Sequence, residues 1–217
     1  MMRPLPRVVL TLPLTLTLCL PFSMFLAASA EAQRASTGPP DWPCVQRLVP
    51  ELAWGTLWPG PSLDALERQW WEDEEVGRLV RFAAARETPR EEALARIREF
   101  VERSEGEADR EERLTLLFSG LFQLTDRERS RTIERIRGAS RGQVSRLESV
   151  AKMVDELEEK RADEHVDPEE IEALSKALFW DQRAFESRQQ ALPALCEQPY
   201  LLEEKLSQMV RIIDAGL

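Results

Sequence analysis

The 217-residue sequence is poor in the residues that most catalytic and metal sites require. It contains one histidine, one tyrosine, three cysteines and nine glycines. A Ser-His-Asp site needs a histidine beside its nucleophile, a zinc site needs three or four ligands, and a phosphate loop needs closely spaced glycines. The sequence carries none of these patterns, and no pair of carboxylates lies among apolar neighbours. We therefore predict that the protein is not an enzyme and has no catalytic residue, no cofactor and no metal.

Acidic residues also outnumber basic ones, with 39 Asp and Glu against 29 Lys and Arg. The net charge of −10 excludes a general nucleic-acid-binding protein, because nothing offsets phosphate repulsion over the whole surface. Scarce glycine and abundant Ala, Leu, Glu and Arg disfavour a β-sandwich or barrel and favour helices. Hydrophobic residues make up 43% of the chain, which is enough for a real core. The composition predicts an all-α fold.

The only histidine does not indicate a metal site. His165 lies in the run Asp163-Glu164-His165-Val166-Asp167, which offers oxygen and nitrogen ligands. No second histidine or cysteine pair is nearby, and the spacing does not match a calcium-binding loop. We expect an exposed loop between two helices.

Residues 1–30 have the pattern of a cleaved signal peptide. Arg3 and Arg7 precede a long apolar run that closes with Ala28-Ser29-Ala30, a small-x-small cleavage pattern. An uncleaved membrane anchor is the alternative, because the run is long enough to span a bilayer. Cleavage would change the net charge to −12 and leave no apolar run of eighteen residues. We expect a periplasmic or secreted protein without stable membrane insertion after cleavage.

Two cysteines remain after such cleavage. In an oxidising compartment, Cys44 and Cys196 most simply form a disulfide, although two separate buried thiols are the alternative. Residues 31–61 are rich in proline and tryptophan and predict an extended leader. The bond would join this leader to a turn between the last two helices.

Residues 62–217 predict a single helical domain of about six or seven helices. The start signals are capping residues and prolines at first helical positions. These signals stand at Ser62, Thr88-Pro89, Thr125, Asp167-Pro168 and Pro199. A wide apolar face marks the most buried helix, with Leu114, Leu117, Phe118, Leu121 and Phe122.

A long helix of some 35 residues is predicted to start at Thr125, with one weak point. At about 1.5 Å per residue this helix would span on the order of 50 Å. Its apolar stripe consists of Ile133, Ile136, Val144, Leu147, Ala151, Val154 and Leu157. The segment Gly138–Gly142 places two glycines on one face and lowers helix propensity. A break there is favoured, and close packing of another backbone against the bare face is the alternative.

Five of the six tryptophans fall within thirty residues near Cys44. Tryptophans anchor irregular segments, which favours a second small core stapled by the disulfide. The alternative is an aromatic groove for a ligand or partner peptide. The five are Trp42, Trp54, Trp58, Trp70 and Trp71.

Charge is segregated along the second half of the chain. Residues 126–146 carry a net charge of +4, and residues 155–172 carry −8. Such alternation usually marks solvated or paired helix faces. The alternative is a docking face made by Arg131, Arg135 and Arg141.

The segment Leu124-Thr125-Asp126-Arg127-Glu128 resembles the Leu-Thr start motif of small helical periplasmic stress chaperones of the Spy and CpxP type. Glu128 stands where that motif has glutamine. The resemblance covers about five residues and implies a chaperone function.

These observations favour an exported, non-enzymatic interaction or accessory protein with an envelope protein as its partner. A homo-oligomer is compatible with the sequence. One alternative is a module whose helices enclose a small apolar ligand, and the chaperone is a variant of either.

Overall fold

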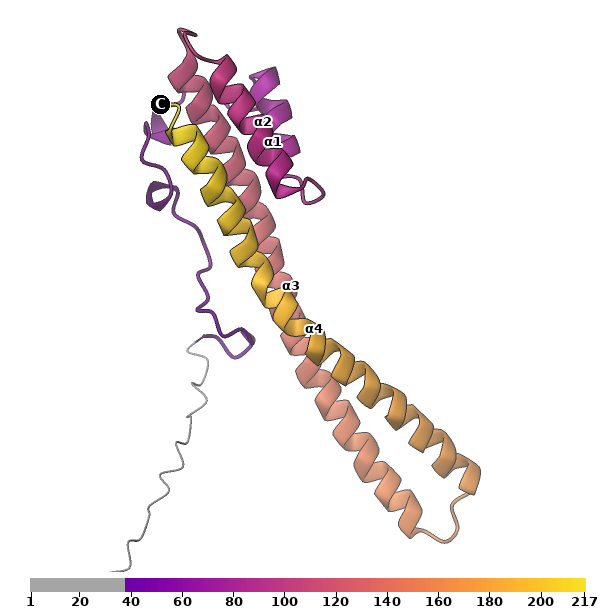
Figure 1. The fold of residues 1–217 in the computed structure, drawn as a ribbon. Coiled ribbons are helices and arrows are strands. Elements are labelled where there is room, and N and C mark those ends of the chain that lie inside the picture. The colour runs from indigo at the N-terminus through magenta and orange to yellow at the C-terminus, as the bar shows by residue number, and fades with distance from the viewer. Residues whose placement is uncertain (1–37) are drawn as a thin grey trace, which may run out of the picture. The chain divides into compact units, whose positions relative to one another are not determined.

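The computed structural model describes residues 38–217, so the predicted signal peptide and the first part of the leader lie outside the described residues. Within that range there are four α-helices and two short 3-10 helices, and no strand (Figure 1). The all-α prediction is confirmed, but the predicted number of six or seven helices is wrong. The elements are η1 (Trp54–Thr56), η2 (Leu63–Ala65), α1 (Glu74–Ala84), α2 (Arg90–Arg103), α3 (Arg110–Ala162) and α4 (Pro168–Asp214).

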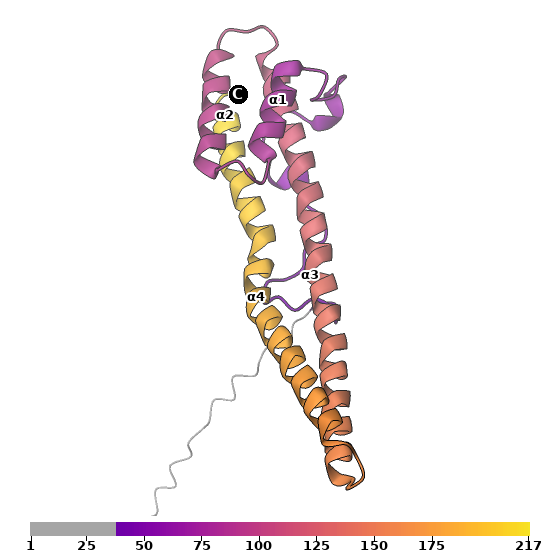
Figure 2. The same cartoon turned by 90° about the vertical axis from the view of Figure 1, so that its right-hand side faces the viewer.

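There are fewer helices than predicted because α3 and α4 each continue through positions where a helix was predicted to start or end. Thr125 lies buried in the interior of α3 instead of capping a new helix. The neighbouring turns carry buried Leu121 and Arg129, so packing on both sides keeps the chain helical past a local capping signal. Pro193 and Pro199 lie inside α4, which changes direction along its middle third (Figure 2). A proline inside a helix removes one backbone hydrogen bond and bends the helix.

Other predicted boundaries agree with the structure in part. The Asp167 side chain accepts a hydrogen bond from the Glu169 amide, with Pro168 at the first position of α4. Ser62 caps only the 3-10 helix η2, and the longer α1 begins after Asp73, which accepts from the Val76 amide. Thr88 does not cap α2, because Pro89 occupies the capping position without a side-chain bond.

The main hydrophobic core lies at one end of the α3–α4 pair, where α1 and α2 pack against it (Figures 1 and 2). We call this region the head. As predicted, Leu114, Leu117, Phe118 and Leu121 are fully buried there, whereas Phe122 is only partly buried. The end of α4 completes this core with Leu206, Met209, Val210 and Ile213.

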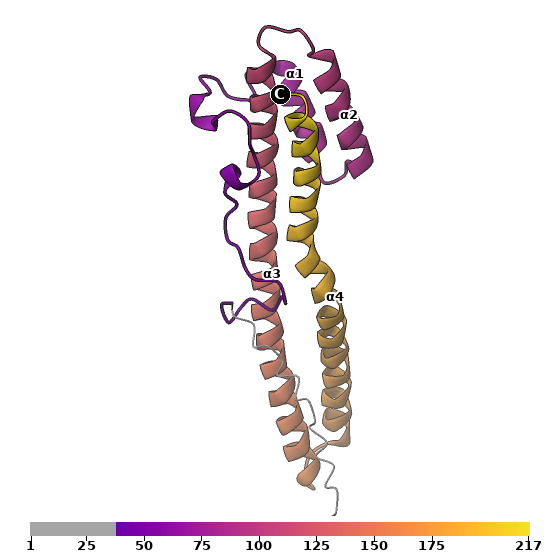
Figure 3. The same cartoon turned by 60° about the vertical axis from the view of Figure 1, so that its left-hand side comes forward.

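Beyond the head, α3 and α4 continue as an antiparallel hairpin, which we call the arm (α3 from Gly138 and α4 up to Leu195; Figure 3). Arg146 binds Asp181 at 2.7 Å, and Gln143 donates to the Phe185 carbonyl at 3.2 Å, which fixes the pairing register. The less exposed positions are spaced by three and four residues on each helix, as in a coiled coil. They include Gln143, Arg146, Val150, Met153 and Leu157 on α3, and Ile171, Leu174, Leu178, Asp181 and Phe185 on α4.

Two expectations for this part of α3 are wrong. The predicted stripe is buried or partly buried at Ile133, Ile136, Val154 and Leu157 but exposed at Val144, Leu147 and Ala151. In this middle part the neighbouring positions Gln143, Arg146 and Val150 face α4 instead. The helix is also unbroken at Gly138–Gly142. A Cβ added at Gly138 or Gly142 would meet nothing within 4 Å, so no other backbone packs closely there either.

Candidate interaction surfaces

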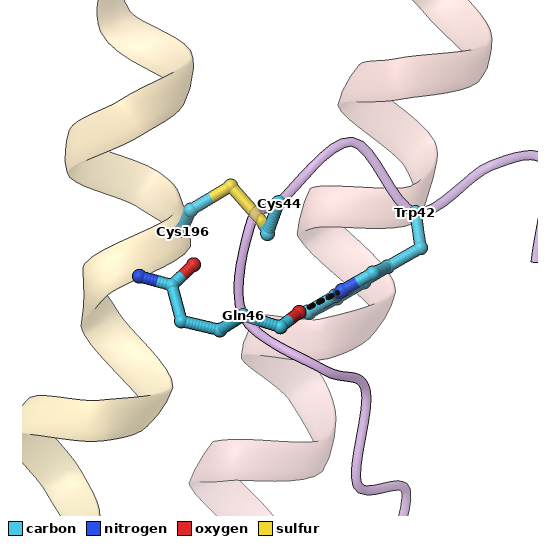
Figure 4. Close-up of a disulfide and its surroundings, with 4 residues drawn as sticks. All are labelled: Trp42, Cys44, Gln46 and Cys196. Atoms are coloured by element: carbon cyan, nitrogen blue, oxygen red, sulfur yellow. Dashed lines mark hydrogen bonds between the residues drawn. A yellow bond between two sulfur atoms is a disulfide. The ribbon is translucent and has the colours of Figure 1, made fainter. Parts of the chain in front are cut away.

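The disulfide ties the leader to the middle of α4. Cys44 and Cys196 are bonded with their Cα atoms 5.6 Å apart and 152 residues between them in sequence (Figure 4). The bond lies within the continuous helix α4, and not in a turn as the predicted break would require. Trp42 packs beside it in a small cluster with Ile133 and Ile136 of α3. Its indole Nε1 donates to the Gln46 carbonyl at 2.7 Å, which closes the local loop (Figure 4).

Ion pairs hold the leader against α3. One Asp41 carboxylate oxygen accepts from Arg137 at 3.0 Å and from Arg141 at 2.6 Å. The hydrogen bond from Arg137 is the main reason that the pKa of Asp41 lies below its ordinary value, and Arg141 adds to the effect. The pKa of Arg137 is raised in turn by the same bond. Asp41 is therefore ionised at any physiological pH, and its charge anchors the leader.

Arg129 is a structural residue that the sequence analysis did not single out. It is almost fully buried, pairs with Glu203 of α4, and donates to the Val49 carbonyl at 2.6 Å. One guanidinium thus joins the leader, α3 and α4. The periodicity of the helix could have indicated it, because Arg129 lies three residues before Thr132 and seven before Ile136, on the same inward face.

The five clustered tryptophans divide between two environments. Only Trp42 lies beside the disulfide. Trp58 stacks on Phe118 with ring centroids 4.3 Å apart, and the buried Trp70 donates from Nε1 to Gln123 at 3.1 Å. Both belong to the head core, with Trp54 partly buried against it. Trp71 is the exposed member, at 52%.

The three candidate docking arginines do not form one face. Arg131 and Arg135 lie near Glu128, at 3.7 and 3.5 Å, whereas Arg141 pairs with Asp41 of the leader. Each guanidinium has a carboxylate partner within the chain. The arginine-rich stretch is thus partly occupied in holding the leader.

The arm exposes large apolar side chains and encloses polar ones. Val144 and Leu147 on α3 are 56% and 55% exposed, while their neighbours Gln143 and Arg146 face α4. On α4, Phe179 and Trp180 are 53% and 62% exposed and pack edge to face on each other, 5.2 Å apart. The sequence analysis missed this aromatic pair, although both residues lie off the apolar stripe of their helix.

An open groove lies between α3 and α4 where the arm meets the head. Its volume is about 610 Å³, and five of its eleven lining residues are glycine or alanine, with two arginines beside them. The Gln143 Oε1 atom is buried and accepts no hydrogen bond within residues 38–217. The lining residues are Arg86, Gly138, Ala139, Gly142, Gln143, Arg188, Ala191, Leu192, Ala194, Leu195 and Gln198.

The end of the arm carries the acidic segment and the histidine. His165 is exposed in the loop between α3 and α4, and its Nδ1 lies 3.2 Å from Asp163. Lys160 binds Glu170 across this loop at 3.0 Å, and that bond raises the pKa of Lys160. Residues 38–217 contain no group of three side chains placed to hold a metal ion.

None of the helices in residues 38–217 has the length and apolar character needed to cross a membrane. Comparisons with protein families, with curated proteins and with solved structures found no match.

Proposed function

We propose that this chain is an exported, non-enzymatic accessory protein that binds an envelope protein through the arm. The head and the stapled leader serve as its rigid base. The interaction residues are the exposed Val144, Leu147 and Phe179. Val144 lies seven residues, about two turns, after Arg137, which binds Asp41 of the leader.

One observation supports this proposal above the others. The arm keeps Gln143 and the Arg146–Asp181 ion pair between its helices while Val144 and Leu147 face outward. Burying polar groups and exposing apolar ones lowers the stability of an isolated hairpin. A contiguous exposed apolar surface on a folded protein usually marks a binding site. A partner bound to this side of the arm would cover the exposed Val144 and Leu147.

Export is supported by the disulfide. Such bonds form and persist outside the reducing cytosol, and Cys44–Cys196 closes a loop of 152 residues around the leader. The N-terminal pattern of residues 1–30 supports the same compartment.

Photo-cross-linking tests the proposed surface. A photoreactive residue at Leu147 should capture one envelope protein in cells, whereas the same residue at Trp71 should not. Trp71 is a matched control because it is 52% exposed but lies beside α1 in the head. The double variant Val144→Ser with Leu147→Ser should abolish co-purification of that protein without changing the thermal midpoint. Equal capture from Leu147 and Trp71 would contradict the proposal.

A second candidate function rests on the groove. Its volume of about 610 Å³ falls in the range of small-molecule sites, and Arg86 and Arg188 stand beside apolar walls. That chemistry suits an amphiphile with an anionic head group, such as a fatty acid. Native mass spectrometry of the monomer should then show a bound amphiphile that Arg188→Ala with Arg86→Ala removes.

The chaperone alternative has less support. Leu124 and Thr125 lie in the interior of α3, and Thr125 is buried. The helix start on which the resemblance depends is therefore not formed at these residues.

A further inference from the structure

The groove and the exposed Trp180 complement each other in size. The indole is 62% exposed on α4, and the groove lies two to three turns further along the same helix. We propose that two copies of the chain associate through their arms, with Trp180 of each copy seated in the groove of the other. This contact does not include Val144 or Leu147, so the inference does not depend on the proposed function. Phe179, which packs on Trp180, borders both surfaces.

The heptad spacing places Trp180 on the groove side of α4. Ala191, Ala194 and Gln198 line the groove, at spacings of three and four. Continuing this spacing toward the start of α4 reaches Ser187 and Ala184 and then Trp180. We call this row the α4 strip. Its members are Ala173, Ala177, Trp180, Ala184, Ser187, Ala191, Ala194, Gln198 and Leu201, and none of them is charged.

Every second member of the α4 strip, from Ala173 to Leu201, lies symmetrically about Ser187. In an antiparallel pair centred on Ser187, residues equally far before and after it face each other. Trp180 then faces Ala194 of the second copy, seven residues from the centre on each side. Leu201 faces Ala173, fourteen residues from the centre. Each large side chain meets a small one, which is the condition for close packing of two helices.

The same register brings opposite charges together beside the α4 strip. Lys176 lies eleven residues before Ser187, and Glu197 lies ten residues after it. Neither has an ion-pair partner within the part of the chain that the structure describes. Lys176 of one copy would therefore lie beside Glu197 of the other, twice per dimer because the contact is two-fold symmetric.

The size of the contact fits a stable dimer. From Ala173 to Leu201 the α4 strip extends about 42 Å at 1.5 Å per residue. Two helical hairpins that pack along this length can bury roughly 800 Å² per partner, the usual size of a specific interface. The groove is also roomy enough for an indole, because its volume of about 610 Å³ lies in the range of sites that enclose whole small molecules.

Sedimentation equilibrium of the purified protein tests the association. The protein should be a dimer at micromolar concentration, and Trp180→Ser should raise its dissociation constant on the order of 30-fold, as for a central aromatic anchor. The matched control is Leu147→Ser, because Leu147 is 55% exposed on the other side of the arm. It should leave the dissociation constant unchanged. Circular dichroism should show the same helix content in both variants.

Two further variants test the register. Ser187→Cys should form a disulfide-linked dimer on mild oxidation, because Ser187 meets its own copy at the two-fold axis. Gln189→Cys, also exposed on α4 but off the α4 strip, should not. Lys176→Glu should weaken the dimer, and combining it with Glu197→Lys should restore it.

Three results would overturn the dimer. They are a monomer at all concentrations up to the millimolar range, equal cross-linking from the two cysteine positions, and a monomer that retains an amphiphile in the groove. The last result would support the ligand-binding candidate instead. Loss of the envelope partner in the Val144→Ser and Leu147→Ser variant, with the dimer intact, would show that the two surfaces act separately.

Discussion

At the scale of single residues, Arg129 is the side chain that joins the leader to both α3 and α4. Its side chain is 4% exposed, and it is bound at once to Glu203 and to the Val49 and Pro50 carbonyls. Burying a charge is unfavourable unless the charge is paired and hydrogen-bonded. Each of the three guanidinium nitrogens of Arg129 donates to one acceptor, and the acceptors come from two separate parts of the chain. It therefore determines where the leader crosses α3.

Replacing Arg129 should destabilise the protein strongly. In Arg129→Leu, Glu203 loses its partner and two leader carbonyls lose their donor, so we expect a loss of about 3 kcal/mol in the free energy of unfolding. That value is at the low end for a buried pair, since Glu203 is 35% exposed and can be hydrated. Urea unfolding measures the loss. The control is Arg127→Leu, an exposed residue of the same helix, which should change stability by less than about 0.5 kcal/mol.

Equal effects of the two leucine substitutions would show that Arg129 is not the anchor. Arg129→Lys should recover only part of the stability, because one ammonium cannot replace the planar fork that reaches Val49, Pro50 and Glu203 together.

At the scale of helices, α3 shows how an unfavourable local sequence is accommodated. It passes through Gly138 and Gly142 without a break, although each glycine lowers helix stability. The pairing with α4 on either side of these residues compensates, through the Ile136 cluster and the Arg146–Asp181 ion pair. Helix stability in proteins comes mainly from such packing.

Gly142→Ala should stabilise the monomer by about 0.5 to 1 kcal/mol, because the added Cβ meets nothing within 4 Å. Thermal unfolding at low protein concentration measures the gain. Gly120→Ala is the opposite control, because there a Cβ would lie 2.7 Å from Val80 and 2.9 Å from Trp70. It should destabilise the protein. A loss of stability in Gly142→Ala would mean that another part of the protein covers the groove floor.

At the scale of the whole described unit, the disulfide and the ion pairs divide the leader between two anchors. The disulfide holds residues near Trp42, and Arg129 holds residues near Val49. Further on, Trp58 is part of the head core and stacks on Phe118. The leader is therefore attached to the rest of the protein at three separate places. Losing one attachment should loosen only the residues near it.

The double variant Cys44→Ser with Cys196→Ser tests this division. Closing a loop of 152 residues stabilises the fold by at most about 4 to 5 kcal/mol through chain entropy. Hydrogen exchange should increase in residues 38–48, where Trp42 loses its cover. It should stay unchanged around Trp58 and Trp70, which belong to the head core. Uniform loosening from residue 38 to residue 72 would show that the disulfide alone holds the leader.

Local signals in the sequence were sufficient for several features. Composition and the 3.6-residue periodicity predicted an all-α fold, because each helix must bury one apolar face. The buried face from Leu114 to Leu121 and the start of α4 at Asp167-Pro168 depend on residues a few positions apart, so they too could be predicted. The pairing of Cys44 with Cys196 followed from counting, since only two cysteines remain after residue 30.

Other features depended on contacts between distant segments, and only the tertiary structure decided them. Thr125 and Pro193 carry local signals to start or stop a helix, and packing across α3 and α4 overrides both. The choice between Val144 and Gln143 for the inward face of the arm is a rotation by one residue, which the register of the opposite helix decides through Arg146 and Asp181. For the same reason the exposed surfaces of the arm, and with them the candidate interaction sites, could not be located from the periodicity of either helix alone.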